Sequence, residues 1–306
     1  MVSRSVMNIK KTIRKWVNLF HSHFADDVYN IGIIPHSDDI LTCASMPAIK
    51  WLSHTFNDRW FADPFIVAED IDTYTIFVET YYYDVRKGAL GVIVADKKDF
   101  KLQSYKDILV LPTHLSFPCY YYEDGELYVY PENSNSGNNT LYRYDWQKQE
   151  MIKIAIQCNY PWTDAAIMSG DRKWITTTYR QDCNGSICHV FFYDDFNKKY
   201  IHKHDIAFLD NTARGAGLPF MTVDGRLIRP AQNCNNGYGL GLVFQEVTIE
   251  DDKLILKEIN RLYPNDKKYN IGLHTYNRFG NVAIVDGYHN PSKFGVWCWN
   301  QIKRFI

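Results

Sequence analysis

Hydrophobic and polar residues alternate along most of this chain in short runs, and a tight polar turn recurs within these runs. The turn with its following strand begins at residues 72, 124, 170, 224 and 280, which gives steps of 52, 46, 54 and 56 residues. Alternation with a period of two indicates a strand with one buried face. Turn-bearing strands that repeat every ~50 residues are typical of propeller blades. The pattern therefore predicts five blades around one axis.

Each repeat has the same predicted order of strands. An inner strand precedes the turn, a second strand follows it, and a third alternating strand comes next at residues 88–94, 140–144, 187–193, 240–247 and 294–299. Residues 28–34 are also strand-like, and we expect them to complete the last blade, because this would close the ring without an exposed edge. We thus predict an all-β fold, a five-bladed β-propeller over residues 28–306.

The N-terminal segment has a different pattern. Within residues 6–24, apolar side chains recur at helical spacing beside a basic face, so we predict an amphipathic helix within a separate element, residues 1–27. Such a helix can pack against the propeller. It can also dock on a membrane surface or a partner protein, and these alternatives stay open.

Composition narrows the functional classes. The net charge of −1 gives no electrostatic support for binding nucleic acid. The seven cysteines show no zinc-like spacing, and we expect free thiols. We find no signal peptide and no apolar run long enough to span a membrane, so we expect a cytoplasmic protein, with possible peripheral contact at the inner membrane face through residues 6–24. Common phosphate-loop, dinucleotide and zincin motifs are missing, so we predict no cofactor and no metal.

The repeat also shows which polar side chains can meet at the axis, because the first strand of each blade lines the channel of a propeller. Asp63, Glu132 and Asp164 are the candidate catalytic residues. Two carboxylates flanking a bond, one ionised and one protonated, are the minimum equipment for cleaving a glycosidic linkage. Like charges crowded together separate their pKa values, which supplies this difference. The alternative is that the Asp residues only support turns.

Further polar residues lie on or near the predicted inner strands and could bind substrate. They are Glu79, His114, Ser116, Arg214, Arg229, Gln232 and His274. Histidine can contact a sugar hydroxyl, or it can be a satisfied core residue. Arg229 and Gln232 can bind a sugar, phosphate or carboxylate, or they can tie two blades together through buried hydrogen bonds. The run His202-Lys203-His204-Asp205 resembles a metal motif in composition, but it lies in a predicted outer strand or loop.

Several of these segments resemble a known family. The motifs at residues 61–65, 114–118, 130–132 and 229–234, with 28–34 and 272–275, are similar to the five-bladed propeller at the N-terminus of plant glucosamine inositolphosphorylceramide transferase and its bacterial relatives. More distantly, the chain resembles the propellers of arabinanase, β-xylosidase and invertase-type glycosidases. That likeness implies that Asp63 acts as base or nucleophile, although Glu132 precedes Asp164 in the opposite order to those enzymes.

These observations lead to two expectations about function. The first is a carbohydrate-active enzyme, glycosidase-like or glycosyltransferase-like, in surface-polysaccharide or glycolipid metabolism. It would cleave or transfer a glycosyl unit with Asp63 as base or nucleophile, Glu132 as acid and Asp164 as a tuning carboxylate. The second is a non-catalytic propeller that binds a glycan or a partner in a polysaccharide-assembly complex.

Overall fold

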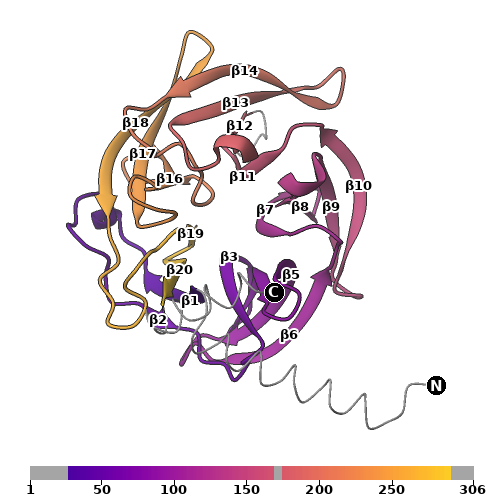
Figure 1. Ribbon diagram of the computed structural model, residues 1–306, viewed down its shortest axis with the longest axis vertical. Helices are drawn as coiled ribbons and strands as arrows, with labels where there is room; N and C mark the ends of the chain where they lie inside the picture. The colour runs from indigo at the N-terminus through magenta and orange to yellow at the C-terminus, as the bar shows by residue number, and fades with distance from the viewer. Residues whose placement is uncertain (1–26, 169–173, 291–306) are drawn as a thin grey trace, which may run out of the picture.

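The computed structural model describes residues 27–168 and 174–290, and in this part of the chain five four-stranded antiparallel sheets surround a central axis (Figure 1). Blade one contains β3 (Arg59–Glu69), β4 (Thr73–Tyr82), β5 (Lys87–Asp96) and β6 (Leu102–Leu109). Blade two contains β7 (Ser116–Glu123), β8 (Glu126–Glu132), β9 (Asn139–Asp145) and β10 (Glu150–Cys158). Blade three contains β11 (Trp162–Ile167), β12 (Trp174–Tyr179), β13 (Ile187–Asp194) and β14 (Lys199–Ala207).

The remaining two blades complete the ring. Blade four contains β15 (Phe220–Met221), β16 (Leu227–Gln232), β17 (Leu242–Glu250) and β18 (Lys253–Leu262). Blade five contains β19 (Tyr276–Phe279), β20 (Val282–His289), β1 (Val28–Pro35) and β2 (Lys50–Trp51). The described helical turns are short: η1 (Asp38–Leu41), η2 (Ser134–Ser136) and η3 (Arg180–Asp182). The predicted all-β, five-bladed propeller is therefore confirmed.

The recurring turn of the sequence joins the first and second strands of a blade. Between β7 and β8 it consists of Asp124 and Gly125, with φ values of 50° and 80°. Positive φ at both central residues matches the right-handed twist of the flanking strands, which is why Asp-Gly is favoured in two-residue hairpins. The corresponding turn of blade three falls in residues 169–173, outside the described part of the chain.

Blade five joins two distant parts of the sequence. Strand β1 pairs with β20 from Val28 opposite His289 to Pro35 opposite Val282, and its other edge pairs with β2. The third position of this blade thus belongs to β1, whereas the repeat placed the third strand at residues 294–299, which lie outside the described residues. The correction has a simple cause, because a repeat in sequence cannot show that a strand from the other end of the chain fills the position.

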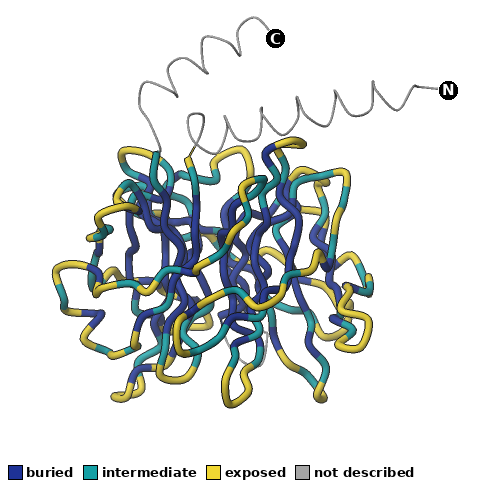
Figure 2. Tube along the Cα trace, turned by 90° about the horizontal axis from the view of Figure 1, so that it is seen from below, coloured by how far each residue is buried: buried dark blue, intermediate teal, exposed yellow. Residues whose placement is uncertain are grey.

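The hydrophobic core lies between neighbouring blades, and the exposed positions gather at the turns (Figure 2). Phe65, Phe117 and Trp162 are fully buried and pack in one cluster that joins blades one to three. The helix predicted within residues 6–24 lies outside the described residues. In the described part of the chain no helix is long and apolar enough to cross a membrane.

Candidate active site at the propeller axis

The inner strands of the first three blades share one backbone distortion. Asp63, Phe117 and Asp164 have φ values of 48°, 41° and 45°, and the pairing register of each strand shifts at that point. A left-handed residue in a bulge leaves the ladder, so its N–H is free to bond elsewhere. The N–H of Asp63 donates to Asp286 Oδ2 at 3.0 Å, and that of Asp164 donates to Glu132 Oε2 at 3.2 Å.

The third of these N–H groups follows the same rule, because Phe117 N donates to Asp63 Oδ2 at 3.0 Å. Each bond thus runs from a residue of one blade to a carboxylate of the preceding blade, with blade five preceding blade one. Three carboxylates near the axis are therefore also the links between blades. The local conformation of the inner strands explains why acidic residues collect here.

His274 lies between two of these carboxylates. Its Nδ1 is 2.7 Å from Asp286 Oδ1, and its Nε2 is 3.5 Å from Asp63 Oδ1. Burial lowers the pKa of His274, but Asp286 and Asp63 outweigh burial and raise that pKa to about 9. The imidazole therefore carries its proton at neutral pH.

The pKa values of the two carboxylates beside His274 are shifted in opposite directions. Asp286 accepts the backbone N–H groups of His274, Thr275 and Asp63. Burial opposes ionisation of Asp286, yet His274 and these donors lower its pKa. For Asp63, burial raises the pKa, and Asp164, Glu79 and Asp286 add to the rise against the opposing effect of His274. Its Oδ1 is buried and accepts no hydrogen bond from a described residue.

A second group consists of Glu132, Asp164 and Arg214. Arg214 Nε donates to Asp164 Oδ2 at 2.5 Å, and its Nη2 lies 3.6 Å from Glu132 Oε2. Burial and the charge of Asp164 raise the pKa of Glu132 to about 8, even though Arg214 and Ser134 oppose this. Burial acts in the same direction on Asp164, but Arg214 and the hydrogen bond to Glu132 lower its pKa. Near neutral pH, Glu132 is thus protonated and Asp164 ionised.

The ring of polar groups continues through Glu79 and His114. His114 Nε2 is 3.2 Å from Glu79 Oε1, and its Nδ1 accepts the backbone N–H of Gly88 at 3.0 Å. Burial lowers the pKa of His114, but Glu79 outweighs it and the pKa is raised. The His114 side chain is 33% exposed, against 10% for Glu132 and 4% for Asp63. Among these three side chains, His114 is therefore the most accessible to solvent.

Aromatic side chains surround this ring. The guanidinium of Arg214 lies 4.8 Å from the ring centre of Tyr238, and Tyr238 meets His274 edge to face at 5.2 Å. The ring centre of Tyr29 also lies 5.2 Å from that of His274, and the ring centre of Trp60 lies 4.7 Å from that of Tyr29. These rings keep water from much of the charged cluster, which strengthens its electrostatic interactions.

Two of the other predicted binding residues lie at the cluster and one does not. Gln232 Nε2 donates to Asp164 Oδ2 at 2.7 Å, and Ser116 pairs with Glu132 in the ladder of blade two. Arg229 is fully buried, and its three nitrogens donate to Thr176, Gln245 and the carbonyl of Ala213. Arg229 therefore ties blades three and four together, which is the alternative considered for it, and it does not reach the carboxylate ring.

Two participants, Tyr29 and Tyr238, had no role predicted from the sequence, whereas Asp286 was indicated as a polar candidate at the predicted end of a second strand. Asp286 lies on β20, the second strand of blade five, and Glu132 and Gln232 end the second strands β8 and β16, so equivalence between blades was the signal that indicated Asp286. Tyr29 and Tyr238 gave no comparable signal, because one comes from the closing strand and the other from a loop.

The axis also offers a set of donor atoms for a cation. Asp63, His274 and Asp286 each present one ligand atom, and these atoms lie within 4.8 Å of one another. One imidazole nitrogen with two carboxylate oxygens suits a divalent metal. A divalent cation would compensate two ionised carboxylates, whereas the proton on His274 compensates the charge of one.

Sequence comparison places the chain near one group of proteins. The family model "Glucosamine inositolphosphorylceramide transferase 1, N-terminal" matches residues 30–278. Glucosamine inositolphosphorylceramide transferase 1 of Arabidopsis thaliana is 25% identical over 221 residues, which covers 68% of this chain and 27% of the relative. The protein of the same name from Oryza sativa subsp. indica is 22% identical over 281 residues, 86% of this chain and 37% of the relative. The chain thus spans well under half of these relatives, and the resemblance predicted from its motifs is confirmed.

Solved structures resemble the chain only loosely. A bifunctional GH43-CE protein of Bacteroides eggerthii has a TM-score of 0.45 and 13% identity, over 70% of this chain and 28% of that one. A luciferin-regenerating enzyme has a TM-score of 0.39 and 10% identity, over 75% of this chain and 68% of that one. No functional conclusion follows from likenesses of this size.

Proposed function

We propose, on the premise that this chain belongs to the family of the N-terminal domain of glucosamine inositolphosphorylceramide transferase 1, that residues at its axis bind a glycosylated ligand. These residues would cleave or transfer a glycosyl unit. The relatives carry a sugar transferase in their name, which supports a carbohydrate as the ligand. Surface-polysaccharide or glycolipid metabolism is the context in which such a ligand occurs.

The pair Glu132 and Asp164 carries this proposal. The two carboxyl groups are neighbours, yet one has its pKa raised to about 8 and the other has it lowered. Carboxylates whose environments separate their pKa values in this way are the usual acid and base of glycoside chemistry. Glu132 would donate a proton to the leaving oxygen, and Asp164, paired with Arg214, would keep that proton on Glu132 until the bond breaks.

Asp63 would serve as base or nucleophile in its ionised form. A positively charged His274 at 3.5 Å favours the ionised form. Burial opposes ionisation, so the role requires a ligand whose developing positive charge lowers the pKa of Asp63 in the transition state. An oxocarbenium-like sugar has that charge.

A specific observation favours a second candidate, a propeller that binds a glycan without turning it over. Asp63 is only 4% exposed at its side chain, and one of its oxygens already accepts the N–H of Phe117. A carboxylate used in this way can be a structural link between blades. On this hypothesis the polar ring recognises hydroxyl groups and no bond is broken.

One experiment separates the two candidates. The full chain is screened against oligosaccharides and activated sugar donors, and both ligand binding and product release are measured by mass spectrometry. For a ligand that is turned over, Glu132→Gln and Asp63→Asn are compared with Glu126→Gln, an exposed glutamate of the same strand as Glu132. We expect both axis variants to lose turnover by about 10²–10⁴-fold, and the control to keep it. Ligands that bind without product, unaffected by Asp63→Asn, would support the binding-only candidate.

A further inference from the structure

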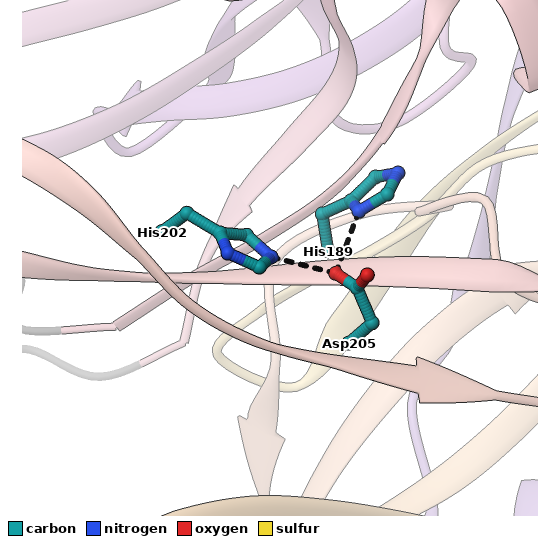
Figure 3. A group of neighbouring side chains, drawn as sticks. All are labelled: His189, His202 and Asp205. Carbon is teal, nitrogen blue, oxygen red and sulfur yellow. Dashed lines mark hydrogen bonds and ion pairs between the residues drawn. The ribbon is translucent and has the colours of Figure 1, made fainter.

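A second cluster of metal-binding side chains lies away from the axis, on blade three. His189 stands on β13, and His202 and Asp205 stand on the outermost strand β14 (Figure 3). His189 and Asp205 are direct partners across the two strands. The run from His202 to Asp205 stood out in the sequence, but the third member, His189, comes from a different strand and became visible only through the pairing.

A β-bulge brings His202 to the same side as Asp205. The pairing register shifts between Val190 and Phe191, which face His204 and His202, so that Lys203 is the extra residue. Residues three apart in a regular strand point to opposite faces, and one extra residue in a bulge restores the same face. Lys203 itself pairs with Asp252, and His204 contacts the carbonyl of Leu254, so both take other partners.

The three side chains converge on one oxygen atom. His189 Nδ1 lies 2.7 Å and His202 Nε2 lies 2.6 Å from Asp205 Oδ1, and Figure 3 shows both rings directed at that atom. One ligand atom from each residue lies within 4.8 Å of the other two. In a tetrahedral zinc site with bonds of about 2.0–2.1 Å, neighbouring ligand atoms lie about 3.3 Å apart, so changes of at most about 1.5 Å in the distances between these atoms would admit the ion.

Neighbouring aromatic rings hold the imidazoles in these orientations. Tyr179 stacks on His189 with ring centres 3.8 Å apart and an angle of 16°. Phe191 meets His202 edge to face at 5.4 Å. Ligands that are oriented before the metal arrives lose little conformational entropy on binding. The cluster is also accessible, since the side chains of His189, His202 and Asp205 are 16%, 38% and 48% exposed.

The same bulge occurs in blade four, where an ion pair takes the place of a cluster of imidazoles. Its outer strand has the corresponding register shift, and there Glu258 forms an ordinary ion pair with Arg261 at 2.7 Å. In blade three no described lysine or arginine pairs with Asp205. The negative charge is instead faced by the two imidazoles of His189 and His202.

We propose that His189, His202 and Asp205 form a zinc site in which two imidazole nitrogens, one carboxylate oxygen and a water complete a tetrahedron. Each imidazole would bind the ion in its neutral form through the nitrogen now directed at Asp205 and carry its single proton on the other nitrogen. Any proton displaced from the binding nitrogen passes to water. Because β14 is an outermost strand, the ion fastens it to β13 and stabilises blade three. The site is independent of the carbohydrate chemistry proposed for the axis.

The test is a calorimetric titration of the full chain, without a histidine tag, with ZnCl₂. His189→Gln and His202→Gln remove one ligand each. Lys203→Gln is the matched control in the same strand, and His274→Gln removes the donor set at the axis. We expect one equivalent of zinc to bind, and affinity to fall at least tenfold in the first two variants, since losing a ligand costs more than losing its supporting hydrogen bond, about 10–100-fold.

A second readout distinguishes the loss of a metal ligand from misfolding of the variant. Co²⁺ in a four-coordinate site gives intense visible absorption, so each folded variant can be titrated with Co²⁺ and monitored by this signal. The two control variants should keep the signal, and zinc should raise the melting temperature of the unaltered chain only while His189 and His202 are present. Zinc binding that survives in His202→Gln but disappears in His274→Gln would overturn the proposal, as would the absence of binding to the unaltered chain.

Discussion

The backbone N–H of Asp164 donates to Oε2 of Glu132 at 3.2 Å, so the two carboxyl groups proposed for catalysis also join blade three to blade two. Their geometry is fixed by the backbone rather than by flexible side chains alone. A proton donor held in this way loses little orientational freedom when a ligand arrives. The same bond means that substitutions here affect both chemistry and folding, and the predictions below keep these effects apart.

Glu132→Gln should abolish the pH dependence of turnover together with most of the turnover. Glu132 is protonated below its pKa of about 8 and ionised above it. Turnover by the unaltered chain should therefore fall as the pH rises from 7 to 9, because the proton donor is lost. The measurement is kcat against pH for a confirmed glycan substrate. A rate that stays constant up to pH 9.5 would rule out Glu132 as the acid.

The same substitution should stabilise the protein at alkaline pH. In the unfolded chain Glu132 ionises near its ordinary pKa of 4.5, whereas in the fold it keeps its proton up to about pH 8. The folded state binds more protons between these values, so Glu132 reduces stability as the pH rises from about 4.5 to 8. Thermal melts at pH 5 and pH 8.5 test this. The melting temperature of Glu132→Gln relative to the unaltered chain should rise with pH, while Glu126→Gln shows no such trend.

Asp286→Asn should destabilise the protein, most strongly below neutral pH. Removing one partner of a buried ion pair costs about 3–5 kcal/mol. The pKa of His274 is raised to about 9 in the fold, so the stabilising charge interaction is complete below the unfolded value of 6.5 and is lost as the pH rises through about 9. Urea unfolding at pH 6 and pH 9.5 should show a larger loss at pH 6.

The control for that experiment is Asp224→Asn, because Asp224 forms an exposed ion pair with Arg226. Exposed pairs contribute about 0–1 kcal/mol, so its unfolding free energy should barely change. Equal losses in both variants would mean that the His274–Asp286 pair does not stabilise the ring.

Arg229→Met should reduce stability without weakening ligand binding. Arg229 is fully buried and donates to Gln245, Thr176 and the carbonyl of Ala213. Its removal leaves buried acceptors unpaired, at about 1–3 kcal/mol each. Arg226→Met, at an exposed site two residues after Asp224, is the matched control. If folded Arg229→Met loses glycan affinity while retaining its melting temperature, then Arg229 contacts the ligand, which is one of the two roles that the sequence left open.

The arrangement of blades could be predicted from the sequence because the Asp/Gly turn is a local signal that recurs in the sequence, and in the described part of the chain it lies in the inner hairpins of blades one, two, four and five. The order of strands in blade five could not, since β1 and β20 are distant in sequence and their pairing depends on ring closure. Asp63, Glu132 and Asp164 could be placed near the axis by counting from the turns. Their protonation could not, because it depends on Arg214 and His274, which approach from other blades.

The backbone conformation of the site also could not be predicted from the sequence. The left-handed φ values of Asp63 and Asp164 are acceptable for aspartate, but Phe117 has the same conformation with a bulky side chain. Only the packing of neighbouring blades requires it there. Similarly, His189 had no visible link to residues 202–205 until β13 and β14 were paired.

The pairing of β1 with β20 determines the order of events during synthesis of the protein. Strand β1 is made early, but its partner begins at Val282, so residues 36–281 must be translated first. At about 5–20 residues per second, β1 waits roughly 12–50 s with one edge unpaired. During that interval it can pair wrongly with any exposed strand, including one from another nascent chain. Aggregation through this edge of β1 is therefore prevented only when β20 pairs with it and completes the ring.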